Sequence, residues 1–442
     1  MAEDFTAWVF ALAAIPLFVV LVARYPATFL AALVPSQILL GGMERGALVP
    51  GLRPGELVLG LSLAGLVLSP RWRFHRAVRG PLNSWVALYG LTGLVIPLLA
   101  WTLRGHSVTL DAIQSYASVG KALLVYFAIA PLVIADGELE TTLHWAFWSA
   151  VLSAAVAVLQ RADVPMVNSL LLGYYKSQHL YEGLAGHTSR PSGLAGNWHA
   201  LGLEFMMALV LGWLALRRQS AERPWVLGAG MFLLLFGIAA VATITSIVLV
   251  LAFFGVVLWR ALDSLAPGPR ASLRGLLVAA LLVTSTSLVL YLAAGRSVYL
   301  NTLIPASLYV RLYDWLFVYG PIIRSHLLLG YGPSLPEVAA RSDDSQFVLF
   351  LLRGGVVSLF GWLVATGGIL RWCRREGGYN ESQVGVARVA FVFTAALVGA
   401  SLMQSFFTYT GVVEWYWATI GVASARRSLR PGDAVTSAQR SI

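Results

Sequence analysis

Runs of apolar residues long enough to cross a membrane recur along this chain, and they constrain its fold more than any other feature. Continuous examples lie at 5–23, 82–101 and 225–241. Because water is absent from the bilayer interior, a spanning backbone must satisfy its own hydrogen bonds, as helices and closed barrels do. The runs lack the period-two alternation of a barrel strand. We therefore expect an all-α fold, a polytopic integral membrane helical bundle.

About thirteen segments have the length of a transmembrane helix. They lie roughly at 5–23, 26–42, 55–69, 83–101, 117–135, 141–160, 199–216, 225–241, 243–260, 275–294, 346–370, 386–404 and 411–425. The stretch from 5 to 42 is either a tight hairpin turning at Arg24, Tyr25 and Pro26 or one broken element, so twelve and thirteen spans are both open. No repeat or low-complexity linker divides residues 1–442, which predicts a single transmembrane domain.

The charge distribution predicts the topology. The net charge of +10 could indicate a nucleic-acid partner, but about 18 basic residues fall in one alternating set of loops and about 10 in the other, which is the positive-inside bias. This bias places the loops at 43–54, 102–116, 161–198 and 295–345 outside the cytoplasm and the C-terminus inside. Because topology explains most of the positive charge, we expect no nucleic-acid partner. The first apolar run lacks a basic n-region, so we expect it to be retained. One cysteine, Cys373, excludes a disulfide framework and a multi-cysteine metal site.

The loop at 161–198 ends in a polar, turn-forming stretch just before a span. Glycines and a proline there accompany His187, Arg190, Asn197 and His199, whose side chains can donate hydrogen bonds at the membrane surface. One interpretation is an anion-binding rim. The other is an interfacial loop in which Arg190 snorkels and the histidines meet lipid headgroups.

The loop at 295–345 contains a predicted amphipathic helix lying on the membrane. Arg311, Trp315 and Tyr319 recur at four-residue spacing with apolar neighbours. Arg324 and His326 follow, then a Gly-Tyr-Gly-Pro break at 330–333, and finally Asp343 and Asp344 before the next span. The alternative interpretation is a surface helix with solvated charges. Loops of this length are usually functional, so both loops are candidates for the site.

The order of these features resembles the O-antigen polymerase and O-antigen ligase superfamily. The matching stretches are 190–199, with Arg, Ser-Gly and a small-Asn pair; 311–332, with Arg, an aromatic helix and Leu-Gly-x-Gly; and 344–355, with a polar pair and a later Gly. The resemblance covers the architecture of most of the chain, and its motifs are short.

The resemblance implies a metal-independent, inverting glycosyltransferase of the polytopic GT-C type, without a cofactor, in the bacterial inner membrane. Such proteins transfer a glycan from an undecaprenyl-diphosphate carrier to an acceptor sugar on the outer face, alongside envelope-polysaccharide assembly proteins. Planar guanidinium groups clamp phosphate oxygens bidentately, a role that fits Arg190, Arg311 and Arg324. The remaining candidates for contacting the donor diphosphate and glycan are His187, His199, Asn197, Trp315 and Tyr319.

The chain departs from the ligase pattern where the catalytic base is expected. Ligase-type members carry His-Asn at the start of the span, whereas this chain has Asp344 and Ser345, with Arg353 in place of the usual acidic residue. The frequent Ser-Arg in the mid-chain span reads Ser-Ile at 246–247. These differences favour a polymerase-like or otherwise diverged member and keep ligase-type transfer as an alternative. The candidates for the base are, in order, Asp344, then Asp343 and His326, with Glu204 as an outsider.

Charged residues also occur within the spans. Lys121, Glu204, Arg353 and Glu414 lie in or near them, where a central charge costs roughly 2.5 to 3.5 kcal/mol on insertion scales. We expect these side chains to face the bundle interior, either as structural pairs or lining a substrate cavity. A transporter or flippase of lipid-linked sugars is the rival class. Carriers concentrate polar groups at the midplane, whereas this chain places most of its polarity in the outer loops.

Overall fold

The computed structural model describes most of the chain as an all-α protein. The described residues are 15–44, 53–109, 117–134, 136–175, 191–217, 224–241, 243–261, 306–333, 345–376, 384–402, 404–405, 407, 409 and 411–426. Within them the secondary structure is helical, and the extended pairing is one isolated bridge between Trp72 and Leu132. The predicted fold class is confirmed.

Five helices of the described chain are long and apolar enough to cross a membrane, or six if a bent N-terminal pair counts as one span. The five are Asn83–Leu103, Glu138–Arg161, Trp198–Ala215, Pro224–Val241 and Gln346–Glu376, and three shorter apolar helices are Pro54–Leu68, Ser118–Ile129 and Gly385–Ala400. Because the predicted span at 275–294 lies outside the described residues, the total of twelve or thirteen stays a prediction.

The N-terminal element is broken where the sequence indicated. A helix at Ile15–Arg24 and α2 (Pro26–Leu40) meet at an angle of 117° across Tyr25. The residue before a proline is disfavoured in the helical region, and Pro26 at the start of α2 fits its fixed φ. The break therefore has a local cause.

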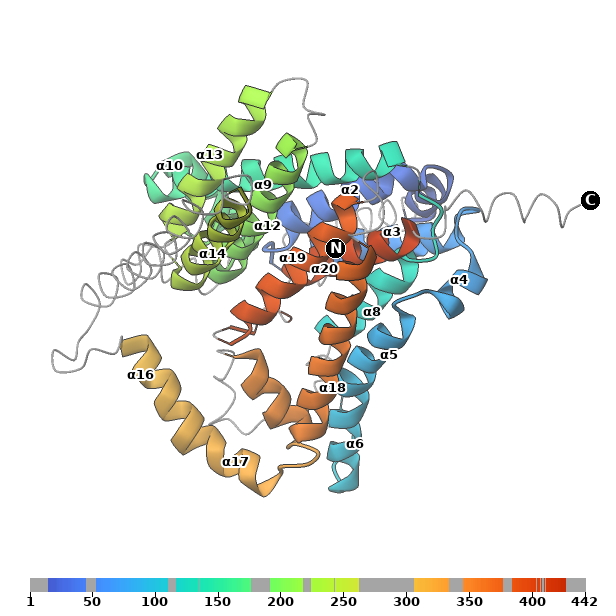
Figure 1. Ribbon diagram of the computed structural model, residues 1–442, viewed down its shortest axis with the longest axis vertical. Coiled ribbons are helices and arrows are strands. Elements are labelled where there is room, and N and C mark those ends of the chain that lie inside the picture. The colour runs from blue at the N-terminus through green and yellow to red at the C-terminus, as the bar shows by residue number, and fades with distance from the viewer. Residues whose placement is uncertain are drawn as a thin grey trace, which may run out of the picture.

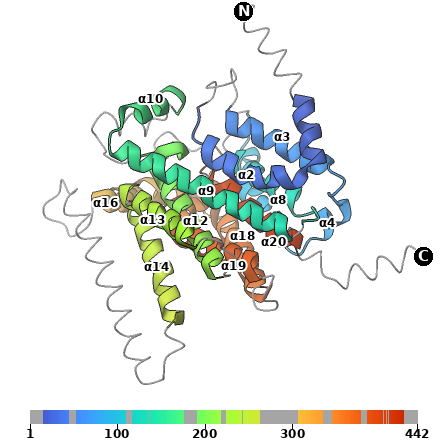
Figure 2. The ribbon, with the colours of Figure 1, turned by 90° about the horizontal axis from the view of Figure 1, so that it is seen from above.

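The centre of the bundle is α12 (Trp198–Arg217), which packs against α9 (Asp136–Arg161) and α13 (Pro224–Val241). Its positions from Ala200 to Leu211 are buried and mostly apolar on every face, the pattern of a helix surrounded by others. Figure 2 places α2 (Pro26–Leu40) beside α9, with α3 (Pro54–Leu68) on one side of the bundle and α14 (Ile244–Ala261) on the other.

A second group of helices contains α8 (Ala117–Ile129), α19 (Val384–Ala400) and α20 (Val412–Arg426), with α20 packed against α8. Beside them one span is built from α5 (Asn83–Gly90), the π-helix η1 (Leu91–Val95) and α6 (Ile96–Leu103). Proline at 97 lacks the N–H that the turn before it needs, which explains a π-turn at this point.

The helix labelled α18 (Gln346–Glu376) folds back on itself, which the single predicted span at 346–370 did not foresee. Gly355 has φ 66° and ψ −163° in its interior. The rings of Phe350 and Trp362 stack with centroids 5.3 Å apart, although residues twelve apart on a straight helix lie about 18 Å apart. A first arm at 346–354 therefore turns at Gly355 and packs against the second arm at 355–376. The second arm alone is about 33 Å long at 1.5 Å per residue, enough to span a membrane.

The remaining described elements are short and lie at the ends of the bundle. They are α4 (Phe74–Arg79), α10 (Pro165–Tyr174), the 3-10 helix η2 (Gly193–Ala195), α16 (Ala306–Tyr313), the π-helix η4 (Asp314–Tyr319) and α17 (Gly320–Ser325). Figure 1 shows α16 and α17 as one continuous rod along the edge of the molecule.

The contacts between helix ends agree with the predicted alternation of loops. The N–H of Glu44 donates to Tyr174 O at 3.1 Å, and Arg104 donates to the carbonyls of Gly330 and Tyr331. These contacts join the segments at 43–54 and 161–198, and those at 102–116 and 295–345, each pair as predicted. We call this the loop end of the bundle. Arg71 pairs with Glu138 at 2.6 Å at the opposite end. Which side of the membrane each end faces stays a prediction.

Candidate functional site

Besides Glu204, the outsider for the base, the structure describes seven of the eleven other side chains that the sequence nominated. They are Asn197, His199, Arg311, Trp315, Tyr319, Arg324 and His326. His187, Arg190, Asp343 and Asp344 lie outside the described residues, so their predicted roles are carried forward unchanged.

Asn197 caps α12. Its Oδ1 accepts the N–H groups of His199 at 2.8 Å and of Ala200 at 3.2 Å, which satisfies two donors that the first turn of a helix leaves unpaired. The turn before it needs Gly196, at φ 67°, where a side chain would also press on the backbone of Gly42. The side-chain oxygen of Asn197 is therefore engaged in building the helix end, and the predicted contact of its amide N–H group with substrate stays a prediction.

His199 begins a polar chain that crosses to a different part of the sequence. Its Nε2 lies 3.4 Å from the amide nitrogen of Gln404, and Oε1 of Gln404 accepts the hydroxyl of Tyr409 at 3.0 Å. Gln404 is buried, whereas His199 and Tyr409 are partly exposed. Sequence reasoning missed Gln404 and Tyr409, because they precede the last span without a charged or histidine neighbour to mark them.

The first part of the loop at 161–198 folds against α2. Glu44 N–H donates to Tyr174 O at 3.1 Å, and the hydroxyl of Tyr175 donates to Leu39 O at 2.5 Å. Burial raises the pKa of Tyr175 to about 12, so this phenol keeps its proton and its hydrogen bond across the physiological range. The start of the loop is thus fixed in place at the loop end.

The predicted surface helix is present as α16, η4 and α17. One face packs inward, with Tyr319 almost fully buried against Leu352 of the first arm of α18 and Trp315 beside it. Arg311 is half-buried, and Arg324 is exposed. Tyr319 therefore anchors the surface helix on α18, a packing role, while the arginines remain near the surface.

The segment after α17 forms backbone hydrogen bonds with α18 on both sides of its break. Tyr331 and Gly332 donate their N–H groups to the carbonyls of Leu352 and Arg353 at 2.6 and 3.0 Å. In return, Val356 N–H donates to Leu327 O at 2.8 Å, and Val357 N–H donates to Leu328 O at 3.3 Å. Backbone groups freed by a broken helix must find partners at membrane depth, and here a loop supplies them on both sides of the break.

Arg104 fastens this loop from the end of α6. Its two terminal nitrogens donate to Gly330 O and Tyr331 O, and its guanidinium carbon lies 5.9 Å from the centre of the Tyr331 ring. The ring of His326 also lies near the Tyr331 ring, at 5.3 Å between centroids. Partial burial, followed by the charge of Arg104, lowers the pKa of His326 below its ordinary value. The imidazole is therefore held neutral, the form that can accept a proton.

Arg353 and the first arm of α18 line a small cavity inside the bundle. The first arm contributes Gln346, Leu349 and Phe350. The other walls come from α5, η1, α6, α8 and the segment before α20: Tyr89, Gly93, Pro97, Ser118, Val119 and Phe407. Gln346 N–H donates to Ser401 O at 2.9 Å, and Gln404 N–H to Ala400 O at 3.0 Å. The first arm thus connects the surface helix on one side with the His199 chain on the other.

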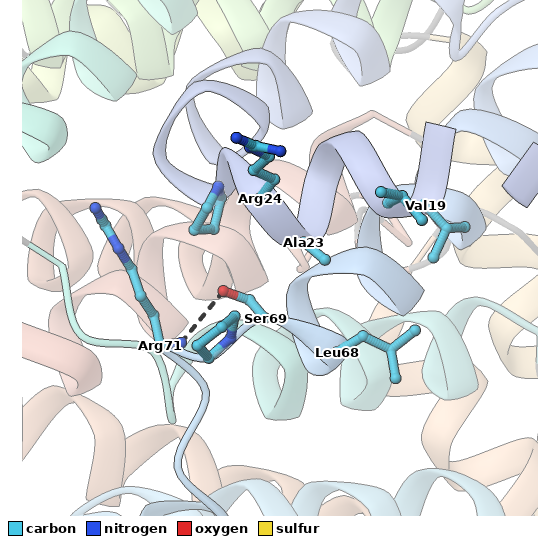
Figure 3. Close-up of a pocket in the computed structure, with 9 residues that line it drawn as sticks. Val19, Ala23, Arg24, Leu68, Ser69 and Arg71 are labelled. Atoms are coloured by element: carbon cyan, nitrogen blue, oxygen red, sulfur yellow. Dashed lines mark hydrogen bonds between the residues drawn. The ribbon is translucent and has the colours of Figure 1, made fainter. Parts of the chain in front are cut away.

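A much larger cavity, of about 580 Å³, opens at the opposite end of the bundle (Figure 3). It lies beside the break before α2 and is lined by Val19, Leu68 and other apolar side chains, with Arg24 and Arg71 at its margin. The N–H of Arg71 donates to Ser69 Oγ at 3.3 Å. None of the seven predicted site residues that the structure describes lines this cavity, so its size does not identify it as the functional site.

The prediction for charges within the spans is confirmed for the two glutamates. Glu204 is 0% exposed and Glu414 is 2% exposed, and Lys121 lies 3.1 Å from Glu414. Among the described residues, no group of three or more His, Cys, Asp or Glu side chains is arranged to hold a metal ion.

These features define a polytopic α-helical membrane protein whose described candidate side chains lie at the loop end. No protein-family model matches the chain, and no curated protein shows a significant sequence match to it.

Proposed function

We propose that this protein is a glycosyltransferase acting at the extracytoplasmic face of the bacterial inner membrane. It takes a glycan from an undecaprenyl-diphosphate carrier and joins it to an acceptor sugar, in the manner of an O-antigen or exopolysaccharide polymerase. One observation carries the proposal. The first arm of α18 brings the surface helix bearing Arg311 and Arg324 into one assembly with the His199 chain at the start of α12.

The donor chemistry supports arginines as the diphosphate-binding groups. The leaving group is an anionic diphosphate at the membrane surface, and guanidinium groups match phosphate oxygens two at a time. Arg311 and Arg324 lie on the surface helix, and in this proposal that helix lies at the depth of the lipid phosphates. Arg190, a few residues before the cap of α12, is the third member of this proposed clamp.

The acceptor chemistry requires one base. Attack on the anomeric carbon forms the new C–O bond while the bond to the diphosphate breaks, and the acceptor hydroxyl loses its proton. Asp344 is our first candidate, with Asp343 beside it and His326 as the alternative. His326 gains support from its neutral state beside Arg104, because a neutral imidazole can take that proton.

A carrier of lipid-linked sugars is the second candidate, and the broken α18 is the observation that favours it. Discontinuous helices are frequent in secondary transporters, where freed backbone groups bind the substrate. In this protein the backbone groups at the break are already paired with residues 327–332. We therefore prefer the transferase.

The discriminating experiment is a deletion strain in which lipid-linked glycan is followed on each leaflet. Loss of a transferase should leave unpolymerised donor that an impermeant sugar-directed reagent modifies in intact spheroplasts. Donor that is modified only after the membrane is opened would instead identify a flippase. Complementation with Arg311→Ala should fail at wild-type protein levels, whereas Arg79→Ala, an exposed arginine of α4 at the opposite end, should restore polymer.

A further inference from the structure

Four charged side chains from four helices meet inside the bundle. They are Glu56 of α3, Lys121 of α8, Glu204 of α12 and Glu414 of α20. Lys121 Nζ lies 3.1 Å from Oε1 of Glu414 and 3.5 Å from Oε1 of Glu56. Three carboxyl groups and one ammonium would together carry two uncompensated negative charges if all were ionised. Burial of unpaired charge inside a membrane bundle is strongly unfavourable.

The two buried glutamates differ in what surrounds their oxygens. Glu414 has the ammonium of Lys121 at Oε1 and accepts the N–H of Gly411 at Oε2, at 2.7 Å. Each of these partners stabilises a carboxylate. Glu204 is fully buried, and neither of its carboxyl oxygens has a hydrogen-bond partner among the described residues. The negative charge therefore belongs on Glu414, and Glu204 is the group that must be neutral.

Gly411 separates the two carboxyl groups. It has φ 90°, and a side chain built there would place its Cβ 2.5 Å from Oε1 of Glu204. The same residue donates its N–H to Glu414. A glycine at this position thus leaves room for the Glu204 carboxyl while it holds the Glu414 carboxylate in place.

Exposure increases stepwise along the cluster. Glu204 is 0% exposed, and the side chains of Glu414, Lys121 and Glu56 are 2%, 18% and 37% exposed. We propose that Glu204 holds an exchangeable proton, and that Glu414, Lys121 and Glu56 connect this proton-binding site to the surface. When Glu204 releases its proton, its O–H bond breaks and an O–H bond forms on Glu414. Lys121 then gives one N–H proton to Glu56 and takes the proton from Glu414, so the cluster keeps its total charge until Glu56 releases its proton to water.

Among the described residues, Glu414 is the ionisable group of the neighbouring helices that acts on Glu204. Lys121 and Glu56 are linked to Glu204 through Glu414. On its own helix the titratable neighbour is His199, five residues earlier and engaged with Gln404. This inference concerns a proton inside the bundle and does not depend on the proposed transferase activity.

Infrared spectroscopy of the purified full-length protein tests the inference directly. A protonated carboxyl has a carbonyl stretch separate from that of carboxylates, and it shifts when H₂O is replaced by D₂O. We expect such an exchange-sensitive band at neutral pH in the wild type, its loss in Glu204→Gln, and its displacement in Glu204→Asp. Glu140→Gln, which changes an exposed glutamate of α9, should leave the band unchanged.

Three results would overturn the inference. One is the absence of an exchange-sensitive carboxyl band in the wild type. Another is a band that survives Glu204→Gln and disappears in Glu414→Gln, which would place the proton on Glu414. The third is a higher melting temperature in Na⁺ than in K⁺ that Glu204→Gln abolishes, which would identify a sodium site. Glu204→Asp keeps the test decisive if the glutamine variant does not fold.

Discussion

The helices α12 and α18 both begin at the loop end, but their backbone groups that lack an intrahelical partner are hydrogen-bonded in different ways. In α12 the first turn is satisfied by its own cap, with Asn197 accepting two N–H groups, and the helix then continues through the bundle. In α18 the chain turns at Gly355, and the groups freed there are satisfied by a separate loop at 327–332. A local solution can be recognised within five residues of sequence. The solution in α18 exists only once two distant segments have come together.

Gly355→Ala in α18 should cause the largest loss of stability. With φ 66° and ψ −163°, Gly355 occupies a backbone region that is essentially restricted to glycine, and an added Cβ would collide with the carbonyl of Leu328. We expect a loss of about 3 kcal/mol or more in the free energy of unfolding. Thermal unfolding of the purified protein in detergent measures it.

Gly367→Ala is the matched control in the same helix. A Cβ at Gly367 would meet no other atom within 4 Å, and alanine is the better helix former by about 1 kcal/mol. This variant should be as stable as the wild type or more so. If Gly355→Ala and Gly367→Ala behave alike, the fold-back of α18 is wrong.

Arg104→Met should have the next largest effect. The guanidinium of Arg104 ties two carbonyls, those of Gly330 and Tyr331, to the end of α6. Hydrogen bonds to a charged group contribute about 1.5–3 kcal/mol when buried, and partial exposure of Arg104 lowers this, so we expect a loss of about 1–2 kcal/mol. Arg104→Lys should recover part of the loss, because an ammonium lacks the planar fork that reaches two acceptors. Equal stability of Arg104→Met and the wild type would show that the loop does not need this link.

The sequence predicted the helices better than their interruptions. Predicted spans at 199–216 and 225–241 match α12 and α13 closely, because an apolar run of this length has few alternatives in a membrane. The fold-back at Gly355 could not be separated from ordinary helix, because Gly361, Gly367 and Gly368 follow in the same run and remain helical. Glycine permits a turn without requiring one.

The candidate site was predictable in its parts and not in its pairings. Polar residues before a span marked Asn197 and His199. An Asn directly before an apolar run is also a helix N-cap signal, but the prediction gave Asn197 a substrate contact instead. The partner of His199 is Gln404, 205 residues further along the chain, and the partners of Arg104 are backbone carbonyls more than 220 residues away. Such pairs depend on how the helices pack, which one sequence read locally does not contain.

Asn197→Ala tests the local solution in α12. Loss of an N-cap side chain costs about 1 kcal/mol, so this variant should lower the melting temperature less than Gly355→Ala does. Asn197→Asp keeps the accepting oxygen and should remain close to the wild type. A change in Asn197→Ala as large as that in Gly355→Ala would mean that Asn197 does more than cap its helix.

The smallest expected effect concerns His326, which lies beside the loop that closes the break in α18. Its pKa in the folded protein is below the ordinary value, because the ring is partly buried and Arg104 is near. A base whose folded pKa is lowered binds fewer protons in the folded than in the unfolded chain. The folded state therefore loses stability as the pH falls from above the ordinary histidine value through the folded value. Melting temperatures measured from pH 7.5 downward should fall slightly more for the wild type than for His326→Gln.

In Arg104→Met the repulsion between Arg104 and a protonated His326 is gone. The His326 pKa should therefore move back toward its ordinary value, and the difference between the two melting curves should shrink. If the His326→Gln and wild-type curves stay parallel in both backgrounds, Arg104 does not set the protonation of His326, and the case for this histidine as the base weakens.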